Sequence, residues 1–248
     1  MIIQPYNFVQ SILRHQLGFH RVVDFDPQKE KLCRLDFTST NTTLSSEIID
    51  DENKFSEYVS RQLELAHCQL GIGGYDENRT VYSRSRVFDA ATPGGEPRRI
   101  HLGTDIWGPV GKNVYAFMGG MVHSRAFNDN YGDYGATLVL LHQLDGMPFY
   151  TLYGHLGLQD IQKLDAGQYV TRGQVIGHFG NLKENGHWPP HLHIQLILDM
   201  ELKKGDYPGV CKYSEREKYL ANCPDPDLVL QLNKYLPNLP ASSSAPTQ

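Results

Sequence analysis

The stretch Pro189-Pro190-His191-Leu192-His193-Ile194-Gln195-Leu196-Ile197 decides how the chain is interpreted. Its apolar residues and its length predict a β-strand, on which alternate side chains point to the same side. His191 and His193 then face one side, and Leu192 faces the core. Histidine pairs at this spacing also occur packed or solvated without a metal, so this pair indicates a metal site only together with further donors.

Short apolar runs separated by glycine-rich turns surround this strand. They cover residues 113–117, 120–123, 136–142, 149–153, 174–177 and 192–198. Regular short strands between turn signals predict an antiparallel β-sheet or sandwich. The fold class is therefore mainly β.

The boundaries of the region with short apolar runs divide the chain into three parts. Residues 1–74 predict a small α+β appendage, with helical spacing near the start, a strand over 31–38, and a helix that begins at Asp50 or Asp51. Residues 75–200 form the expected core. Residues 201–248 form a C-terminal extension of loops and short helices, with one helix over 227–236 and a low-complexity tail that we expect to be disordered. Residues 71–74 predict a turn, and residues 81–88 a strand.

Composition excludes several functional classes. The 248 residues carry a net charge of −5 and have a pI of about 6.1, which argues against nucleic acid or an anionic membrane as partner. We expect no membrane span, and no secretory signal is evident, so the sequence as written predicts a cytoplasmic protein that acts outside only after lysis or another export route. No feature indicates an oligomeric state. The four cysteines form no Cys-x-x-Cys pair and are expected to be reduced thiols.

Two further segments supply donors that zinc prefers. Arg99-Ile100-His101-Leu102-Gly103-Thr104-Asp105 offers an imidazole and a carboxylate, and Tyr153-Gly154-His155-Leu156 offers another imidazole. Gly103 argues against a helix there, so a strand followed by a loop would bring His101 and Asp105 to one ion. Each segment alone is a weak indicator. Among the other histidines, His142 at the end of an apolar strand is expected nearest the site.

Taken in order, His-x-x-x-Asp, Tyr-Gly-His-Leu and Pro-His-Leu-His resemble the lysostaphin-like, LytM-type zinc endopeptidases, which cleave peptidoglycan cross-links. The resemblance covers residues 99–200 and includes Gly132-Asp133-Tyr134-Gly135, the run 165–177 and Gly180. It implies a zinc-dependent hydrolase that cleaves a peptide bond in peptidoglycan or in related short peptides.

The resemblance also implies a role for each residue of the site. His101, Asp105 and His193 would be the ligands of one zinc ion per chain, with no other cofactor. His155 and His191 would be catalytic and would flank the water position; either one takes the proton while the other stabilises charge or protonates the leaving amine.

Some features depart from the family pattern and keep alternatives open. The stretch 181–190 is bulkier than usual, and the loop 127–134 predicts a second wall of the cleft. Arg79, Arg98 and Arg99 are either surface charges or a clamp for a substrate carboxylate. The same scaffold also fits a catalytically silent binding module, or a metal-dependent hydrolase of a small amide or ester unrelated to the wall. Residues 1–74 either stay clear of the site, cover it, or add a fourth ligand.

Overall fold

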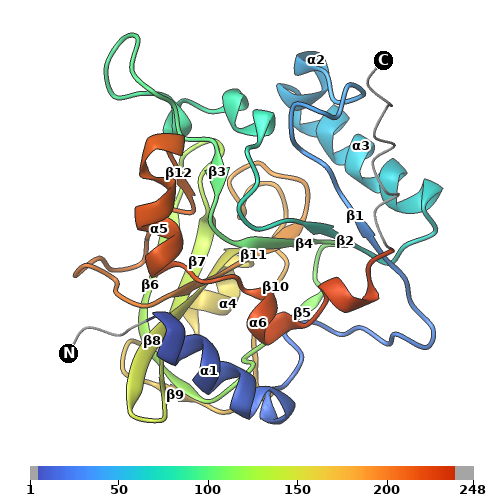
Figure 1. The fold of residues 1–248 in the computed structure, drawn as a ribbon. Coiled ribbons are helices and arrows are strands. Elements are labelled where there is room, and N and C mark those ends of the chain that lie inside the picture. The colour runs from blue at the N-terminus through green and yellow to red at the C-terminus, as the bar shows by residue number, and fades with distance from the viewer. Residues whose placement is uncertain (1–4, 238–248) are drawn as a thin grey trace, which may run out of the picture.

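The computed structural model describes residues 5–237, and its central element is an eight-stranded sheet with the order β1-β2-β4-β11-β8-β7-β6-β9 (Figure 1). β1 and β2 run parallel, and the other neighbours run antiparallel. Its strands are β1 (Leu32–Arg34), β2 (Leu70–Gly73), β4 (Thr104–Trp107), β6 (Gly120–Asn128), β7 (Gly135–Leu144), β8 (Met147–Leu156), β9 (Tyr169–Val170) and β11 (His191–Ile197). The predicted mainly β fold with an antiparallel core is confirmed.

Two small sheets and short helices complete the fold. The two-stranded sheets pair β5 (Asn113–Tyr115) with β10 (Val175–His178), and β3 (Ile100–His101) with β12 (Val210–Cys211). The α-helices are α1 (Pro5–His15), α2 (Ser46–Ile49), α3 (Glu52–Leu65), α4 (Leu158–Gln162), α5 (Arg216–Asn222) and α6 (Asp227–Leu230). The 3₁₀-helices are η1 (Gln16–Gly18), η2 (Thr80–Arg84), η3 (Arg86–Phe88), η4 (Tyr213–Glu215) and η5 (Asn233–Tyr235). Within residues 5–237, no helix has the length and apolar character needed to cross a bilayer.

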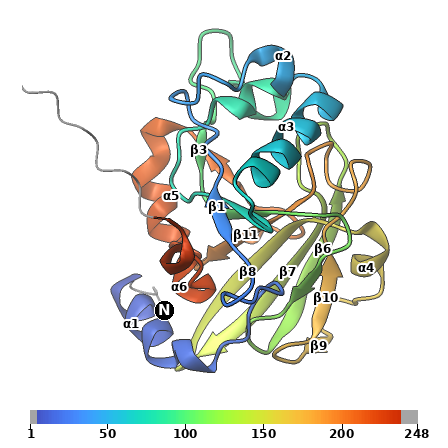
Figure 2. The ribbon, with the colours of Figure 1, turned by 90° about the vertical axis from the view of Figure 1, so that its right-hand side faces the viewer.

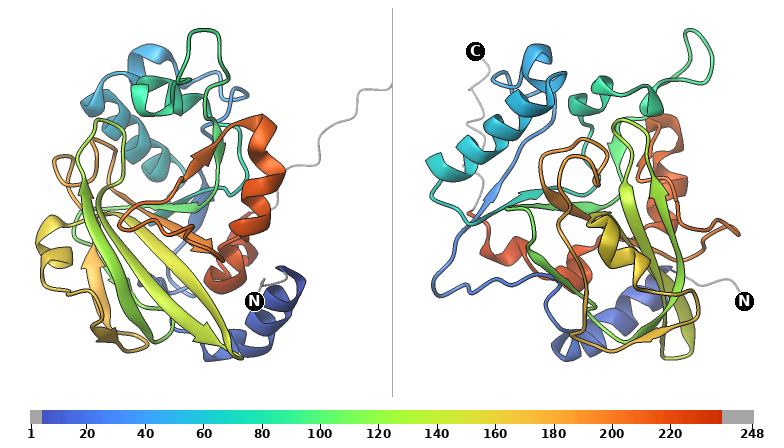
Figure 3. Two further views of the ribbon diagram at one scale, coloured as in Figure 1. Left: turned by 90° about the vertical axis from the view of Figure 1, so that its left-hand side faces the viewer. Right: turned by 180° about the vertical axis from the view of Figure 1, so that it is seen from behind.

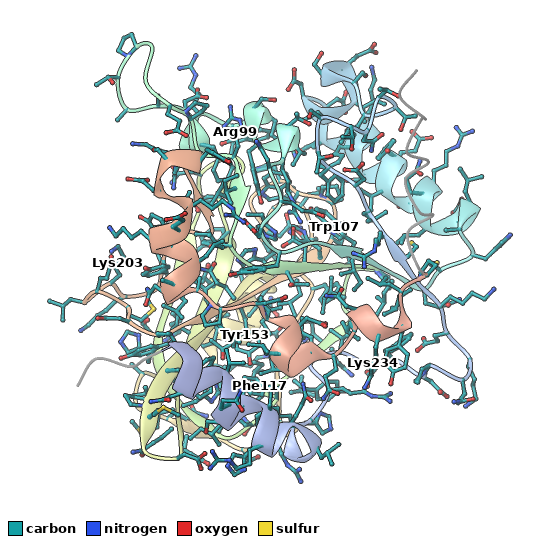
Figure 4. The ribbon with its side chains drawn as sticks, in the orientation of Figure 1. Arg99, Trp107, Phe117, Tyr153, Lys203 and Lys234 are labelled. Carbon is teal, nitrogen blue, oxygen red and sulfur yellow. The ribbon has the colours of Figure 1, made fainter. Side chains whose placement is uncertain are left out.

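The antiparallel strands β7 and β8 form the middle of the molecule. Figure 2 shows α1, α5 and α6 on one side of them and α4 with β10 on the other. Because both faces are covered, β7 is almost continuously apolar and buried over its first six residues. Figure 4 labels Phe117 and Tyr153 in the lower half of the molecule, where both belong to the largest buried apolar cluster.

The N-terminal segment extends this sheet. Asp51 begins α3 as its N-cap, with its carboxylate accepting hydrogen bonds from the backbone N–H groups of Asn53 and Lys54, as the sequence predicts. The predicted turn at 71–74 is wrong, because residues 70–73 form β2 and pair with β4. Gly71 permits this packing, since a Cβ there would lie 2.5 Å from Cδ1 of Leu35.

Two other predicted elements differ in the structure. Residues 81–88 form η2 and η3 instead of a strand, because consecutive turns bury Val81, Tyr82 and Phe88 together. The helix predicted over 227–236 is interrupted at Gln231, whose φ is 52°. The Asp227 carboxylate there accepts from two backbone N–H groups that follow the helix. The predicted disordered tail lies outside the described residues, and the four cysteines are free thiols, as expected.

We predict that Phe8→Ala lowers the free energy of unfolding by about 3–5 kcal/mol, the usual cost of removing a buried aromatic ring. Phe8 is 1% exposed and packs edge-on against Phe149, with ring centroids 5.0 Å apart. Denaturant unfolding followed by circular dichroism measures the change. The matched control is Leu17→Ala, because Leu17 follows the same helix and is fully exposed; an equal loss in both variants would contradict the docking of α1.

Candidate active site

Strand pairing brings the expected metal donors to one place. β11 lies between β4 and β8, which sets His193 opposite Asp105 on one side and opposite Gly154 on the other. His101 ends β3 and is joined to β4 by a short link that contains Gly103. Only glycine fits in this link, because a Cβ on Gly103 would lie 2.5 Å from Cε1 of His193.

The donor atoms of His101, Asp105 and His193 form a nearly regular triangle. Nε2 of His101 lies 3.0 Å from Nδ1 of His193 and 3.3 Å from Oδ1 of Asp105, and Nδ1 of His193 lies 3.1 Å from that oxygen. All three residues are buried. Ligands at about 2.0–2.1 Å from a tetrahedral zinc ion stand about 3.3 Å apart. The triangle therefore has the size that zinc requires.

In both imidazoles, the ring nitrogen that points away from the triangle donates a hydrogen bond. The other nitrogen, which faces the triangle, therefore carries no proton. Nδ1 of His101 donates to the carbonyl oxygen of Gly74 at 2.8 Å, and Nε2 of His193 donates to Oε1 of Gln195 at 3.0 Å. Metal-binding histidines commonly have such carbonyl partners. Three acceptors then converge with no proton among them, and a cation satisfies all three. The residues present fit zinc.

Arg79 binds the second oxygen of Asp105, an arrangement that the sequence did not reveal. Its Nη1 lies 2.5 Å from Oδ2 of Asp105, its Nη2 donates to the Gly74 carbonyl oxygen at 3.1 Å, and its Nε donates to Glu77 at 3.0 Å. Arg79 is 1% exposed, so its interpretation as a surface charge is wrong. No motif marks this residue, because its burial follows from the pairing of β2 with β4.

The electrostatics keep Asp105 and His101 in their metal-binding forms. Burial opposes the charge of Asp105, but His101, Arg79 and the hydrogen bonds hold the pKa of its carboxyl well below the usual range. Burial, aided by the charge of Arg79, lowers the pKa of His101 to about 4. At neutral pH the carboxylate is therefore ionised and the imidazole neutral, as metal binding requires.

His155 and His191 lie beside the triad with their rings facing each other. The ring centroids are 4.0 Å apart, and the ring of His191 also stacks on Trp107 at 3.8 Å. Nδ1 of His155 donates to the carbonyl oxygen of Asn185, and Nδ1 of His191 to that of Pro189, both at 2.8 Å. Each ring therefore keeps Nε2 as a free acceptor.

Local backbone geometry positions His155. Its φ is 62°, in the left-handed region that non-glycine residues seldom adopt. Its backbone N–H donates to the carbonyl oxygen of Tyr134, and a Cβ on the preceding Gly154 would lie 2.6 Å from the Tyr134 ring. Residues held in such conformations cluster at functional sites. Burial and the neighbouring His191 keep the pKa of His155 well below its usual value, and burial lowers the pKa of His191 to about 4, so both are neutral.

A cavity of about 130 Å³ lies over these histidines. As predicted, both loops that flank the site contribute to it, residues 132–134 from the loop after β6 and Trp188 from the loop before β11. Arg98 also lines it, whereas Arg99 donates to backbone carbonyl oxygens. The expectation for His142 is wrong, since its ring packs against Phe117 and Phe149 in the lower core.

Comparison with known proteins identifies the central part of the chain. Residues 99–204 match the sequence model described as Peptidase family M23. This segment matches the M23 peptidase family and is called the M23 domain below. It coincides closely with the segment 99–200 that carries the predicted resemblance to LytM-type peptidases, which is confirmed. The expected site residues all lie within the M23 domain.

The M23 domain has curated and structurally characterised relatives. The chain is 32% identical over 151 residues to the L-Ala--D-Glu endopeptidase of Bacillus subtilis, covering 58% of this chain and 44% of the relative. It is 28% identical over 140 residues to the peptidoglycan DD-endopeptidase ShyC of Vibrio cholerae, covering 50% and 30%. The chain thus spans less than half of either relative. Similar structures include a zinc-containing peptidase from Vibrio cholerae (29% identity, 44% and 30% coverage, TM-score 0.33) and the catalytic domain of lysostaphin from Staphylococcus simulans (22%, 53% and 86%, TM-score 0.33).

We predict that Gln195→Leu weakens zinc binding about 10- to 100-fold, the usual effect of losing the partner of a metal-binding histidine. The substitution removes Oε1 of Gln195, which accepts the hydrogen bond from Nε2 of His193. Competition with a chromogenic chelator measures the affinity. Gln143→Leu is the matched control, because Gln143 lies exposed on β7; equal affinity in wild type and Gln195→Leu would contradict the orienting role.

Proposed function

We propose that the chain is a zinc-dependent endopeptidase that hydrolyses a peptide bond in peptidoglycan-derived peptides. The observation that carries the proposal is the convergence of three unprotonated donors, His101, Asp105 and His193, beside two neutral histidines that line the same cavity. The M23 family match and the similarity to two endopeptidases support the reaction class. That the protein is cytoplasmic stays a prediction.

Different residues of the site have different roles in hydrolysis. A zinc ion would be held by the triad and would supply Lewis acidity, which polarises a carbonyl group and lowers the pKa of water towards about 7. His155 and His191 are held with Nε2 free, so either can accept the proton of the attacking water. The histidine that has gained the proton then becomes a donor to the leaving amine. Trp107, stacked on His191, fixes the plane of that ring.

The complete donor set argues against a silent binding module, which has no need to retain it. The first experiment measures zinc in the purified protein by elemental analysis and incubates the same sample with a defined peptidoglycan digest, followed by mass spectrometry. We expect stoichiometric zinc and new peptide fragments. Stoichiometric zinc with an unchanged digest would show that peptidoglycan is not the substrate. Failure to bind zinc would favour the binding module.

Two histidine variants separate metal binding from catalysis. We predict that His193→Ala loses both zinc and activity, because it removes one of three ligands. We predict that His155→Ala keeps zinc but loses about 100- to 10,000-fold in turnover, the usual contribution of a general acid–base group. Metal content and the rate of digest hydrolysis are measured on the same preparations.

The control for both variants is His123→Ala. His123 lies on β6 within the same domain, and its Nδ1 is bonded to the hydroxyl of Ser124. It should keep both zinc and turnover. Full turnover in His193→Ala, or loss of zinc in His155→Ala, would show that the roles are wrongly assigned.

A further inference from the structure

A segment outside the M23 domain covers the catalytic cavity. Residues 79–88, named here the strap, comprise Arg79 with η2 and η3. The strap contributes Arg79, Val81, Tyr82, Val87 and Phe88 to the cavity lining. Figure 3 shows it at the same end of the sheet as the β6–β7 loop and the loop before β11. The strap therefore lies across the end of the cleft that those two loops border.

Arg84 fastens the strap to three different elements at once. Its guanidinium carbon lies 4.7 Å from the ring of Trp188, 4.9 Å from that of Tyr131 and 5.3 Å from that of Phe55. Its Nη2 also donates to the Tyr131 hydroxyl at 2.5 Å. Trp188 precedes β11, Tyr131 belongs to the β6–β7 loop, and Phe55 lies on α3. A desolvated cation over several aromatic faces is strongly held.

Further contacts close the strap onto the β6–β7 loop and the sheet. The Ser85 hydroxyl donates to the carbonyl oxygen of Tyr131. Gly132 must lack a side chain, because a Cβ there would lie 2.4 Å from Cβ of Ser85. At the other end of the strap, Arg79 is joined to Asp105 in the floor of the site. The strap is thus fixed at Arg79 and at Arg84 and Ser85.

The covered cavity reaches the surface at only some of its lining residues. Most of its lining residues are buried, including His155, His191 and His193, which are 5%, 2% and 3% exposed. The lining residues that keep substantial exposure are Val87, Arg98, Asp133, Asp206 and Pro208. These five mark where the cavity meets the surface, whereas the donors His101, Asp105 and His193 are buried.

We propose that the strap restricts this site to short, soluble peptide fragments that enter end-on, and excludes peptides that remain anchored in an intact peptidoglycan network. A peptide tethered at both ends has to lie across an open groove, whereas His155, His191 and His193 are buried in a cavity that the strap lines. The bond that reaches His155 and His191 then lies near the end of the entering peptide. This inference rests on the proposed peptidase function.

The test offers the same bonds in two forms. One batch of purified sacculi is divided; half stays intact, and half is converted by a muramidase to soluble muropeptides of equal peptide content. Because an anchored peptide cannot bring its bond into reacting geometry, which is worth about 100-fold or more in rate, we expect the zinc-loaded wild type to cleave the muropeptides about 100-fold faster than the sacculi. Mass spectrometry should show release of a short terminal piece.

Strap variants then test the cause of this preference. Arg84→Ala removes the main fastening, so it should raise sacculus cleavage and lower the muropeptide-to-sacculus ratio by about tenfold, from the loss of desolvated cation–π contacts. Tyr131→Phe removes only the hydroxyl that Arg84 binds, at a residue that is 40% exposed, and should shift the ratio in the same direction by less. The matched control is Arg86→Ala, an exposed arginine of the same strap, which should leave the ratio unchanged.

The outcomes separate this inference from the proposed function. Equal cleavage of sacculi and muropeptides by the wild type overturns the restriction and leaves the peptidase function intact. A fragment preference that persists unchanged in folded, zinc-loaded Arg84→Ala and Tyr131→Phe also overturns it, because the strap would then not be its cause. Failure of the zinc-loaded wild type to cleave either form overturns the peptidoglycan function itself.

Discussion

The pairing of β4 with β11 is the constraint on which the site depends. It sets Asp105 beside His193 in register, and a shift of one residue would turn every side chain of either strand to the opposite face. On its other side β11 pairs with β8, so the position of His155, next to Gly154 on β8, follows from the same ladder. The backbone hydrogen bonds of three strands therefore determine where the reactive side chains lie.

The M23 domain supplies the donor atoms, but the groups that orient and compensate them come partly from outside it. The Gly74 carbonyl oxygen accepts hydrogen bonds from both His101 and Arg79, and Arg79 neutralises the outer oxygen of Asp105. The negative charge of a buried carboxylate needs a positive partner. The Arg79 guanidinium supplies this partner to Asp105 and so stabilises the site before any metal binds. The segment that precedes the domain is thus part of the chemistry of the site.

The sequence predicts the parts of this protein that have a periodic or motif signal. The short apolar runs predict the sheet, as does the alternation of His191, Leu192 and His193. The ordered motifs predict which side chains converge. The predictions for Arg79 and residues 81–88 are wrong because the burial of these residues depends on partners distant in the chain. The glycines at 71–74 were misread for a related reason: glycine marks close packing as well as turns, and only the neighbouring Leu35 and Trp107 distinguish the two.

The position of β2 bears on how this domain can be isolated. β2 pairs with β4, the strand that carries Asp105, and β1 in turn pairs with β2. A fragment that begins at residue 75 would leave β4 as an unpaired, apolar edge. Such edges recruit strands from other molecules and promote aggregation. The boundary of sequence similarity at residue 99 is therefore not a boundary of folding, and a fragment cut there would also lack the carbonyl group that orients His101.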